Sequence, residues 1–354
     1  MSAPGVALVL GATGVTGTPF AEQLLIAGWR VYGVSRRPPL LKSTASLRVF
    51  VHLPVDLHDG AALHAALRAH PDISHIFDCV NIGAGTARLR PMLNLLDAVE
   101  AGVPRLRNIN LLQGMKYYGC HLGPFRTPAR EGDPCIAGND FYYDIEDMIR
   151  QRQAGKPWTW TALRPHSVCG YAAGNPLNLA LVFAIYASIR RELGEPLWFP
   201  ASDGCFNSLF QVMDADLLAR AAIRVATEPA CANNIYNINN GEFFHWRDLW
   251  PAFAAFFELK AEGPGGEPLA DFLARHRDTW NSLSARLGLR PFPIERAPAW
   301  VRGDYTAPNS RFAAEYDIIA DTTKFRRTGF SETIGNEAMF VRMFKQYRTD
   351  RIIP

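Results

Sequence analysis

Three glycines, Gly11, Gly14 and Gly17, have the spacing of a turn that holds phosphate groups, and they lie between a predicted strand and a predicted helix. The first glycine allows a tight turn, the second lets backbone approach a pyrophosphate, and the third lets the helix pack closely on the strand. The free N–H groups and the dipole at the helix N-terminus favour anions. In this position the motif predicts a dinucleotide-binding site rather than a glycine turn without a ligand.

Arg36 and Arg37 stand at the end of the second predicted strand, where an NAD enzyme carries an acidic residue for the ribose 2′-hydroxyl. A carboxylate there would repel a 2′-phosphate, whereas two guanidinium groups bind it bidentately and stack on the adenine. The alternative is a pair of solvated surface arginines. The pair predicts NADPH/NADP⁺ as the cofactor, and Asp56 and Leu57, after the third strand, are placed to meet the adenine edge.

The residues that could transfer a proton do not follow the spacing usual in short-chain dehydrogenases. Those enzymes place a lysine four residues after a tyrosine, so that the ammonium lies beside the phenol and lowers its pKa. Here Tyr142 is followed at that spacing by Glu146, and Tyr143 by Asp147. Either the chain is not catalytic or the lysine comes from another segment.

Lys116 is the candidate for that lysine. It lies just after the fifth predicted strand, on the carboxyl edge of the sheet where doubly wound folds bind ligands. From this loop its ammonium could reach across to Tyr143. The alternative is an exposed loop lysine with no catalytic role.

Short β-branched runs alternate with helical patterns through the N-terminal half, and they predict the elements that position these residues. The predicted strands are Val6–Leu10, Arg30–Ser35, Arg48–Leu53, His75–Val80, Asn108–Leu112 and Thr159–Leu163. The predicted helices are Pro19–Ala27, Gly60–Ala69, Leu89–Ala101 and Tyr142–Gln153. This alternation implies an α/β fold, a doubly wound parallel sheet of the Rossmann type with helices on both faces.

The chain after about residue 165 has a different character. It is rich in helices, and a further strand at Asn234–Ile238 follows a helix at Ala215–Ala226 that Asp214 caps. We expect an NADP(H)-binding domain over residues 1–165, with the strand near 234–238 returning to it. A smaller, mainly helical substrate lobe over residues 166–354 is interleaved with it. The tryptophans and phenylalanines of that lobe are expected to form core and to line part of the cleft.

The composition of the 354 residues excludes several classes of protein. With 48% hydrophobic and 20% charged residues the chain is not disordered, and a net charge of +3 gives no case for nucleic acid or an anionic membrane. Six scattered cysteines without a C-x-x-C pair suggest a reducing compartment. Four histidines recur every six residues and point in different directions on a helix, so no metal is predicted: His52, His58, His64 and His70.

The longest apolar stretch outside the first strand is Leu177–Ile189, which is too short to cross the hydrocarbon core of a bilayer. The start of the sequence lacks the basic region of a secretion signal. We therefore expect a cytoplasmic protein. A homodimer is a common outcome for the fold, although the sequence does not indicate one.

The motifs together resemble the progesterone 5β-reductase/iridoid synthase-like (PRISE) family, an atypical branch of the extended short-chain dehydrogenases. The segments that carry the resemblance are Gly11–Gly17, Ser-Arg-Arg-Pro38, Lys116-Tyr-Tyr118, Gly123-Pro-Phe125, Phe141-Tyr-Tyr-Asp-Ile-Glu-Asp147 and Arg164-Pro165. It continues through Leu177-Asn178, Asp214-Ala-Asp-Leu217, Tyr236-Asn-Ile-Asn-Asn-Gly241 with Trp246, and Ile352-Ile-Pro354. The resemblance thus covers nearly the whole chain.

This resemblance implies an enzyme that reduces the C=C bond of an activated enone or enal with NADPH. It implies that Lys116 and Tyr143 are the catalytic pair. The matching cofactor positions, with the glycines above, are Thr13, Gly14, Val15, Arg36, Arg37, Asp56, Leu57, Val80, Pro165 and Val168. The expected substrate-pocket residues are Phe125, Tyr142 and Asn178.

The sequence also departs from the family pattern at three places. Extra residues at Gly119-Cys-His121 separate the lysine motif from Gly-Pro-Phe. Asp140 stands where the family commonly has an asparagine, and Leu112 stands where it commonly has a glutamine. These departures concern the substrate more than the reaction.

Chemistry supports the same residues. Hydride addition to the β-carbon of an enone leaves negative charge on the carbonyl oxygen, and a tyrosine made a stronger donor by Lys116 stabilises that enolate. The same pair serves direct carbonyl reduction if the substrate lies differently. The alternatives are therefore a carbonyl reductase, a sugar-nucleotide epimerase or dehydratase, and a non-catalytic NADP(H)-sensing regulator. The missing tyrosine–lysine spacing and the arginine pair argue against the second, and retention of both Lys116 and Tyr143 against the third.

Overall fold

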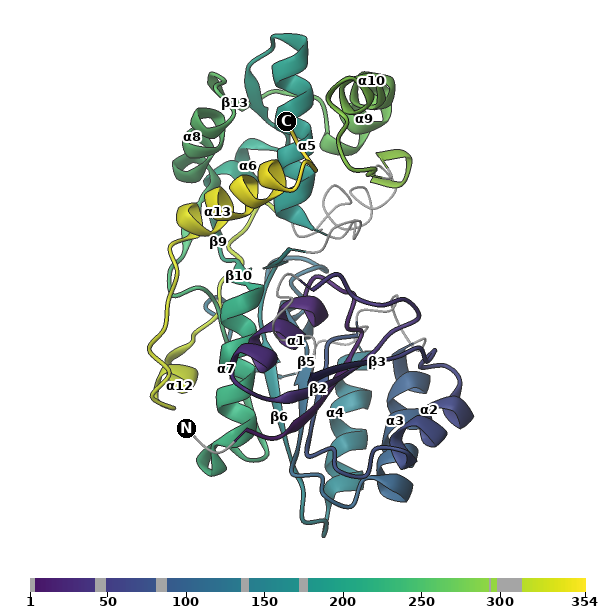
Figure 1. The fold of residues 1–354 in the computed structure, drawn as a ribbon. Helices are drawn as coiled ribbons and strands as arrows, with labels where there is room; N and C mark the ends of the chain where they lie inside the picture. Colours follow the sequence, from purple (N-terminus) through teal and green to yellow (C-terminus); the bar gives the residue numbers. More distant parts are fainter. Residues whose placement is uncertain are drawn as a thin grey trace.

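A computed structural model describes residues 4–41, 49–80, 88–134, 140–171, 178–292, 294–297 and 314–354. Figure 1 shows two bodies, one built around a twisted sheet and one built mainly of helices, and the C-terminus lies in the helical one. None of the helices in these ranges is long and apolar enough to cross a membrane.

The sheet has seven parallel strands in the order β11-β6-β5-β4-β1-β2-β3. The strands are β1 Val6–Leu10, β2 Arg30–Val34, β3 Phe50–Leu53, β4 His75–Asp78, β5 Asn108–Leu112, β6 Thr159–Arg164 and β11 Asn234–Asn237. The Rossmann-type fold expected from the alternating pattern is confirmed. The order reverses between β1 and β4, which makes the carboxyl ends of these strands the place where such sheets bind ligands.

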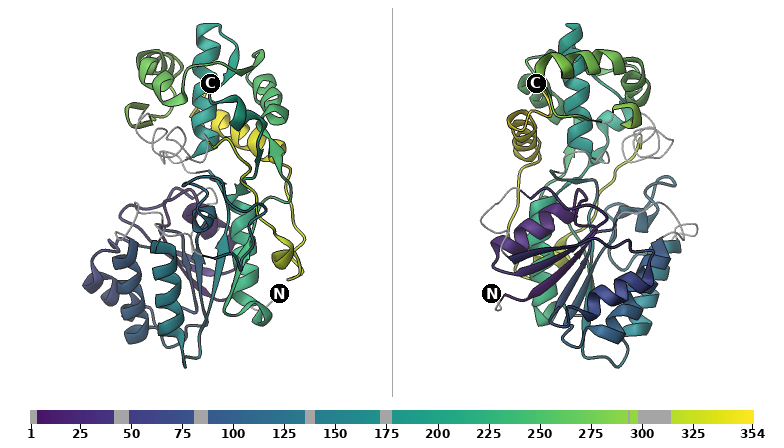
Figure 2. Two further views of the ribbon diagram at one scale, coloured as in Figure 1. Left: turned by 180° about the vertical axis from the view of Figure 1, so that it is seen from behind. Right: turned by 45° about the vertical axis from the view of Figure 1, so that its right-hand side comes forward.

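Helices cover both faces of this sheet (Figure 2). One face carries α1 Gly17–Ile26 and α7 Ala215–Thr227, and the other carries α2 Gly60–Arg68, α3 Leu89–Gly102 and α4 Asp140–Gln153. The side chains of β1 alternate between the two resulting cores, with Leu8 and Leu10 in one and Ala7 and Val9 in the other. This alternation follows from the period of two residues in a strand, and it explains why β1 is apolar throughout.

The helical body has its own core. Its helices are α5 Leu179–Leu193, α6 Asp203–Asn207, α8 Trp246–Phe256, α9 Leu269–Arg275, α10 Arg277–Leu287 and α13 Asn336–Thr349, with α12 Thr323–Arg326 beside the sheet. Short strands pair as β7 Val168–Cys169 with β10 Met213–Asp214, β9 Leu209–Phe210 with β12 Phe244–His245, and β8 Leu197–Phe199 with β13 Ala261–Pro264. Three 3₁₀ turns complete the described elements: η3 Met115–Tyr118, η4 Pro229–Cys231 and η5 Ile294–Arg296.

The aromatic residues of this body form its interior. Trp246, Trp250 and Trp280 are each at most 1% exposed, and Phe183 and Phe253 pack against the first two. These tryptophans therefore form core, as expected for part of the aromatic residues of this lobe.

Two elements from beyond residue 165 belong to the sheet layer. Helix α7 packs against α1, and β11 pairs with β6 at the sheet edge. Asp214 caps α7 as predicted, because its carboxylate accepts the Leu217 N–H at 2.8 Å. The division at residue 165 into cofactor-binding and substrate-binding parts stays a prediction.

Candidate active site

The glycine-rich turn between β1 and α1 needs glycine at both ends. Gly11 has φ +71°, a left-handed conformation that favours glycine. A Cβ on Gly17 would lie 2.1 Å from the Gly11 carbonyl oxygen, so only glycine lets the helix start this close to the strand. Gly14 lies between them and donates its N–H to the same carbonyl at 2.9 Å. Thr13 is exposed, whereas Val15 is buried beside the helix start.

The predicted 2′-phosphate and adenine residues lie beside one another at the carboxyl ends of β2 and β3. Arg36 and Arg37 are exposed directly after β2, and Asp56 is exposed after β3. Hydrogen bonds from the backbone and ring of His58 hold the pKa of the Asp56 carboxyl below its usual range, and the nearby Arg36 charge adds a smaller effect. Two cations and one carboxylate therefore share this edge.

Leu57 is buried below this edge. It lines a small apolar hollow with Leu10, Met92 and Leu95, and Arg88 forms part of the same wall.

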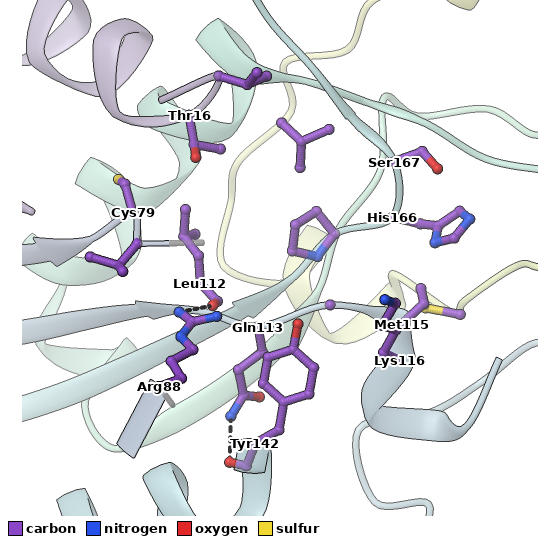
Figure 3. A pocket seen from close by; sticks show the side chains of 15 residues that line it. Thr16, Cys79, Arg88, Leu112, Gln113, Met115, Lys116, Tyr142, His166 and Ser167 are labelled. Carbon is purple, nitrogen blue, oxygen red and sulfur yellow. Dashed lines mark hydrogen bonds between the residues drawn. The ribbon is translucent and has the colours of Figure 1, made fainter. Parts of the chain in front are cut away.

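A larger pocket opens at the carboxyl ends of β4, β5 and β6, next to the glycine-rich turn (Figure 3). Fifteen residues line it: Val15, Thr16, Cys79, Val80, Arg88, Leu112, Gln113, Gly114, Met115, Lys116, Tyr142, Pro165, His166, Ser167 and Val168. Six of the predicted site residues meet there: Val15, Val80, Lys116, Tyr142, Pro165 and Val168. The reversal point of the strand order and these six predicted residues thus coincide, whereas Tyr143 does not line the pocket.

Lys116 and Tyr142 enter this pocket from different elements. Lys116 comes from η3, the turn after β5, and Tyr142 comes from the first turn of α4. In Figure 3 Tyr142 stands between Arg88 and Lys116. The wall therefore carries a phenol and two cations.

Tyr143, the predicted proton donor, lies on a different side of α4. Adjacent helical residues point about 100° apart. Tyr143 packs against the core of the helical body, to which Tyr142 itself belongs, and Phe125 also packs against that core. Its ring lies 4.3 Å from the Tyr117 ring, centre to centre, and its hydroxyl donates to the Tyr117 carbonyl at 3.1 Å. Tyr143 thus contacts the turn that carries Lys116, while its neighbour Tyr142 lines the described pocket.

A buried arginine supports this turn. Arg164 is 0% exposed, and its guanidinium lies 3.1 Å from the centre of the Tyr117 ring. It donates to Gln113 Oε1 at 2.7 Å, to Tyr118 Oη at 3.0 Å and to Glu146 Oε2 at 2.9 Å. Glu146 stands four residues after Tyr142, where a short-chain dehydrogenase has its lysine. In this chain that position holds a carboxylate, and the guanidinium of Arg164 from β6 pairs with it.

Burial raises the pKa of Tyr118 to about 12, so its hydroxyl stays protonated and donates to Asn237 Oδ1 at 2.6 Å. Asn237 belongs to β11, and Tyr118 to the turn after β5. The base of the site therefore joins segments 119 residues apart.

Two of the predicted substrate-pocket residues lie elsewhere. Asn178 is fully buried as the N-cap of α5, and its amide donates to the Gly170 carbonyl at 2.6 Å and to Tyr347 Oη at 2.7 Å. These contacts give Asn178 a structural use, and it is outside the described pocket. Phe125 is half-buried, with its ring edge-on to Tyr316.

Sequence reasoning did not single out Arg88, Gln113 or Ser167 as site residues. Ser167 lines the pocket with φ +41°, and its buried hydroxyl has no hydrogen-bond partner among the described residues. A serine in a left-handed conformation is strained, which is common at binding sites. Ser167 stands between the predicted cofactor positions Pro165 and Val168, and Gln113 stands three residues before Lys116, so these neighbours were the available signal. Arg88 has no such neighbour.

Within the described ranges no group of three histidine, cysteine or acidic side chains could hold a metal ion.

Two family profiles match the chain. Residues 91–354 match the one described as PRISE-like Rossmann-fold domain, and residues 7–120 match the NAD dependent epimerase/dehydratase family. The first match covers more than half of the chain.

Several curated relatives align over 99% of this chain. They include "Short chain dehydrogenase gsfE" of Penicillium aethiopicum, 29% identical over 100% of its length. An "(S)-8-oxocitronellyl enol synthase" of Antirrhinum majus is 28% identical, and a "3-oxo-Delta(4,5)-steroid 5-beta-reductase" of Arabidopsis thaliana is 27% identical, each over 93% of its length.

Solved structures with the same fold include two UDP-glucose 4-epimerases. The enzyme of Bifidobacterium longum, in complex with NAD⁺ and UDP, has a TM-score of 0.69 at 16% identity over 98% of both chains. That of Thermus thermophilus, in complex with NAD, has a TM-score of 0.66 at 18% identity over 97% of this chain and 99% of its own. At this identity the likeness concerns the fold alone.

Proposed function

The chain belongs to the PRISE-like Rossmann-fold family, and from that membership we propose that it is an NADPH-dependent oxidoreductase that reduces the C=C bond of an activated enone or enal. The observation that carries the proposal is the convergence of Lys116 and Tyr142 in one pocket beside the glycine-rich turn, with Tyr143 bonded to the same lysine-bearing turn. Two of its curated relatives are named as an enol synthase and a steroid 5-beta-reductase.

The residues present fit a nicotinamide dinucleotide with a 2′-phosphate. The close packing at Gly17 starts α1 directly after the turn, so that the helix N-terminus can bind a pyrophosphate with Thr13, Gly14 and Val15 around it. The exposed guanidinium groups of Arg36 and Arg37 are available to the 2′-phosphate. Val80, Pro165 and Val168 would border the nicotinamide half in the pocket.

When bound, NADPH would supply a hydride for the β-carbon of the substrate, and solvent would supply the proton that the α-carbon of the enolate takes up. The chain's own task is to stabilise the charge that develops on the carbonyl oxygen. We assign this hydrogen bond to Tyr143, and we assign to Lys116, on the turn that Tyr143 contacts, the role of favouring negative charge there. Tyr142 borders the reacting groups from the neighbouring position.

The substrate that we propose is a small, largely apolar carbonyl compound. Tyr143 and Phe125 both face the core of the helical body, so a substrate that reaches Tyr143 meets aromatic surface. Steroid enones and terpenoid enals are the classes that the names of the relatives suggest.

The test is NADPH oxidation, followed by absorbance, with 2-cyclohexen-1-one, progesterone and a long-chain enal, and product analysis by NMR. We expect a saturated carbonyl product from at least one substrate. An allylic alcohol would instead make the protein a carbonyl reductase. Tight NADPH binding without turnover of any of the three would argue for a cofactor-sensing role and against the proposal.

A further inference from the structure

Arg88 is a buried arginine that the proposed reaction does not use. It directly precedes α3, is 7% exposed, and lines both the large pocket and the apolar hollow beside Leu57. A guanidinium is always charged at physiological pH. A buried charge that borders two cavities needs either complete pairing or a ligand.

The guanidinium of Arg88 lies 5.9 Å from the centre of the Tyr142 ring, and its described hydrogen bonds leave part of it without an acceptor. Its Nη2 donates to Asp78 Oδ2 and to the Leu112 carbonyl, both at the long distance of 3.3 Å. Its Nε is buried and has no hydrogen-bond partner among the described residues. The Asp78 carboxylate balances the charge and also accepts the Val80 N–H at 3.2 Å, which fixes the arginine over the end of β4.

The position of Arg88 relative to the strands distinguishes it from Arg36 and Arg37. Arg36 and Arg37 follow β2, whereas Arg88 contacts the ends of β4 and β5, on the other side of β1. A dinucleotide that sets its 2′-phosphate beside β2 and its nicotinamide at Lys116 must cross β1 and β4 with its pyrophosphate. Val15 and Thr16 from the start of α1 line the same pocket as Arg88. In Figure 3 Thr16 and Arg88 come from different walls.

We infer that Arg88 is a pyrophosphate-binding residue, which supplies a guanidinium from the α3 side while the N-terminus of α1 supplies N–H groups from the other. The inference rests on the proposed dinucleotide cofactor. Its chemistry is a charge-assisted hydrogen bond from Nε and the terminal nitrogens to a bridging or non-bridging phosphate oxygen. No covalent step is involved.

The experiment measures dissociation constants of NADPH, NADH and 2′-AMP by calorimetry for the wild type and for Arg88→Met. Loss of one charged hydrogen-bonding group predicts a weakening of about 10- to 100-fold for both NADPH and NADH. Binding of 2′-AMP, which has the 2′-phosphate but no pyrophosphate, should be unchanged. The Arg36→Met/Arg37→Met variant should show the opposite pattern, with NADPH and 2′-AMP weakened and NADH unchanged.

Arg90→Met is the matched control, because Arg90 is exposed on the same helix two residues later. Arg88→Met leaves the Asp78 carboxylate buried without its partner, so Asp78→Asn/Arg88→Met is compared with Asp78→Asn alone. Relative to Asp78→Asn alone, the added loss of Arg88 should again weaken the binding of NADPH and of NADH equally. Thermal melts check that each variant is folded.

Three outcomes decide. Dissociation constants of NADPH and NADH within twofold of the wild type in the folded variants would overturn the inference. A loss of 2′-AMP binding equal to that of NADPH would make Arg88 a structural residue, and would overturn it too. If the wild type itself binds no NADPH, the proposed function fails first. The binding of inorganic pyrophosphate then tests Arg88 by itself. If the wild type binds pyrophosphate and Arg88→Met does not, the anion site is supported. If both bind it equally, the anion site is refuted.

Discussion

The hydroxyl of Tyr143 donates a hydrogen bond to the backbone carbonyl of Tyr117, 3.1 Å away. This contact joins α4 to the turn that carries Lys116, and it occupies the hydroxyl that we propose as the donor to a substrate oxygen. To act, Tyr143 must exchange the Tyr117 carbonyl for the developing oxyanion. The oxyanion is the stronger acceptor because it is charged, so the exchange favours the transition state over the resting enzyme.

The two adjacent tyrosines are separable by matched substitutions. We expect Tyr143→Phe to lower kcat by about 100-fold or more on weakly activated enones, because the oxyanion loses its donor. Tyr142→Phe should act mainly on KM, with kcat within several-fold of the wild type. Steady-state kinetics with 2-cyclohexen-1-one measures both. If the larger loss of kcat follows Tyr142→Phe, the two roles are exchanged.

The arginine pair after β2 should set the choice of nucleotide. Arg36→Ala/Arg37→Ala is expected to raise KM for NADPH by at least about 10-fold, since charged hydrogen bonds to the 2′-phosphate are lost. KM for NADH should change by less than about twofold. Parallel NADPH and NADH titrations give the ratio, and equal effects on the two nucleotides would refute the assignment.

Glu146 should contribute strongly to stability. Its carboxylate pairs with Arg164, whose side chain is fully buried. Glu146→Gln therefore leaves a buried guanidinium without its counter-charge, and we expect the free energy of unfolding to fall by about 3 kcal/mol or more. Urea denaturation measures this change. Glu100→Gln makes the same substitution in an exposed pair with Arg152 and should cost at most about 1 kcal/mol. Similar losses in both variants would contradict a special role for the buried pair.

His75 should make the protein less stable in mild acid. Burial lowers the pKa of this histidine to about 4, and the Arg107 charge adds a smaller effect. In the unfolded chain the pKa returns to about 6.5. The contribution of neutral His75 to the free energy of unfolding is therefore fully present above about pH 6.5. It is lost as the pH falls toward 4, by up to about 3 kcal/mol.

Unfolding free energies at pH 7.5 and pH 5 should differ less in His75→Gln than in the wild type. His58→Gln, at an exposed site, should keep the wild-type difference. An unchanged pH dependence in His75→Gln would exclude this histidine as its source.

The sheet was predictable because its strands are buried on both faces and interrupted by helical patterns at regular intervals. The expected strands at β1 and β5 have the observed bounds. Others differ at their ends: β4 stops at Asp78, where the aspartate turns back to accept the Val80 N–H instead of extending the ladder.

The orientation of side chains was harder to predict than their position in the chain. Its place after the fifth strand identified Lys116, and the family resemblance paired it with Tyr143. Neither showed that the described pocket receives Tyr142 while Tyr143 bonds to Tyr117. That difference depends on how α4 is rotated against the sheet, and the buried pair of Glu146 on α4 with Arg164 on β6 fixes this rotation.

The sequence did not show the surroundings of Asn178 or of Arg88. Asn178 was expected in the substrate pocket, yet its amide caps a helix and bonds to Tyr347, a residue 169 positions away. Arg88 has the sequence surroundings of a surface arginine, and only the folded chain brings it to Asp78 and the end of β5.

The return of β11 to the sheet has a consequence for the order of synthesis. The Tyr118 hydroxyl donates to Asn237, and the Asn237 N–H donates to Glu131. The turn that carries Lys116 is therefore bonded to a residue that the ribosome adds more than a hundred positions later. A nascent chain that ends at residue 165 has the glycine turn and the lysine but lacks the edge strand and α7. Nucleotide binding should therefore emerge late in translation, and a gene fragment cut at that boundary should need both the edge strand and α7 to be supplied before it folds.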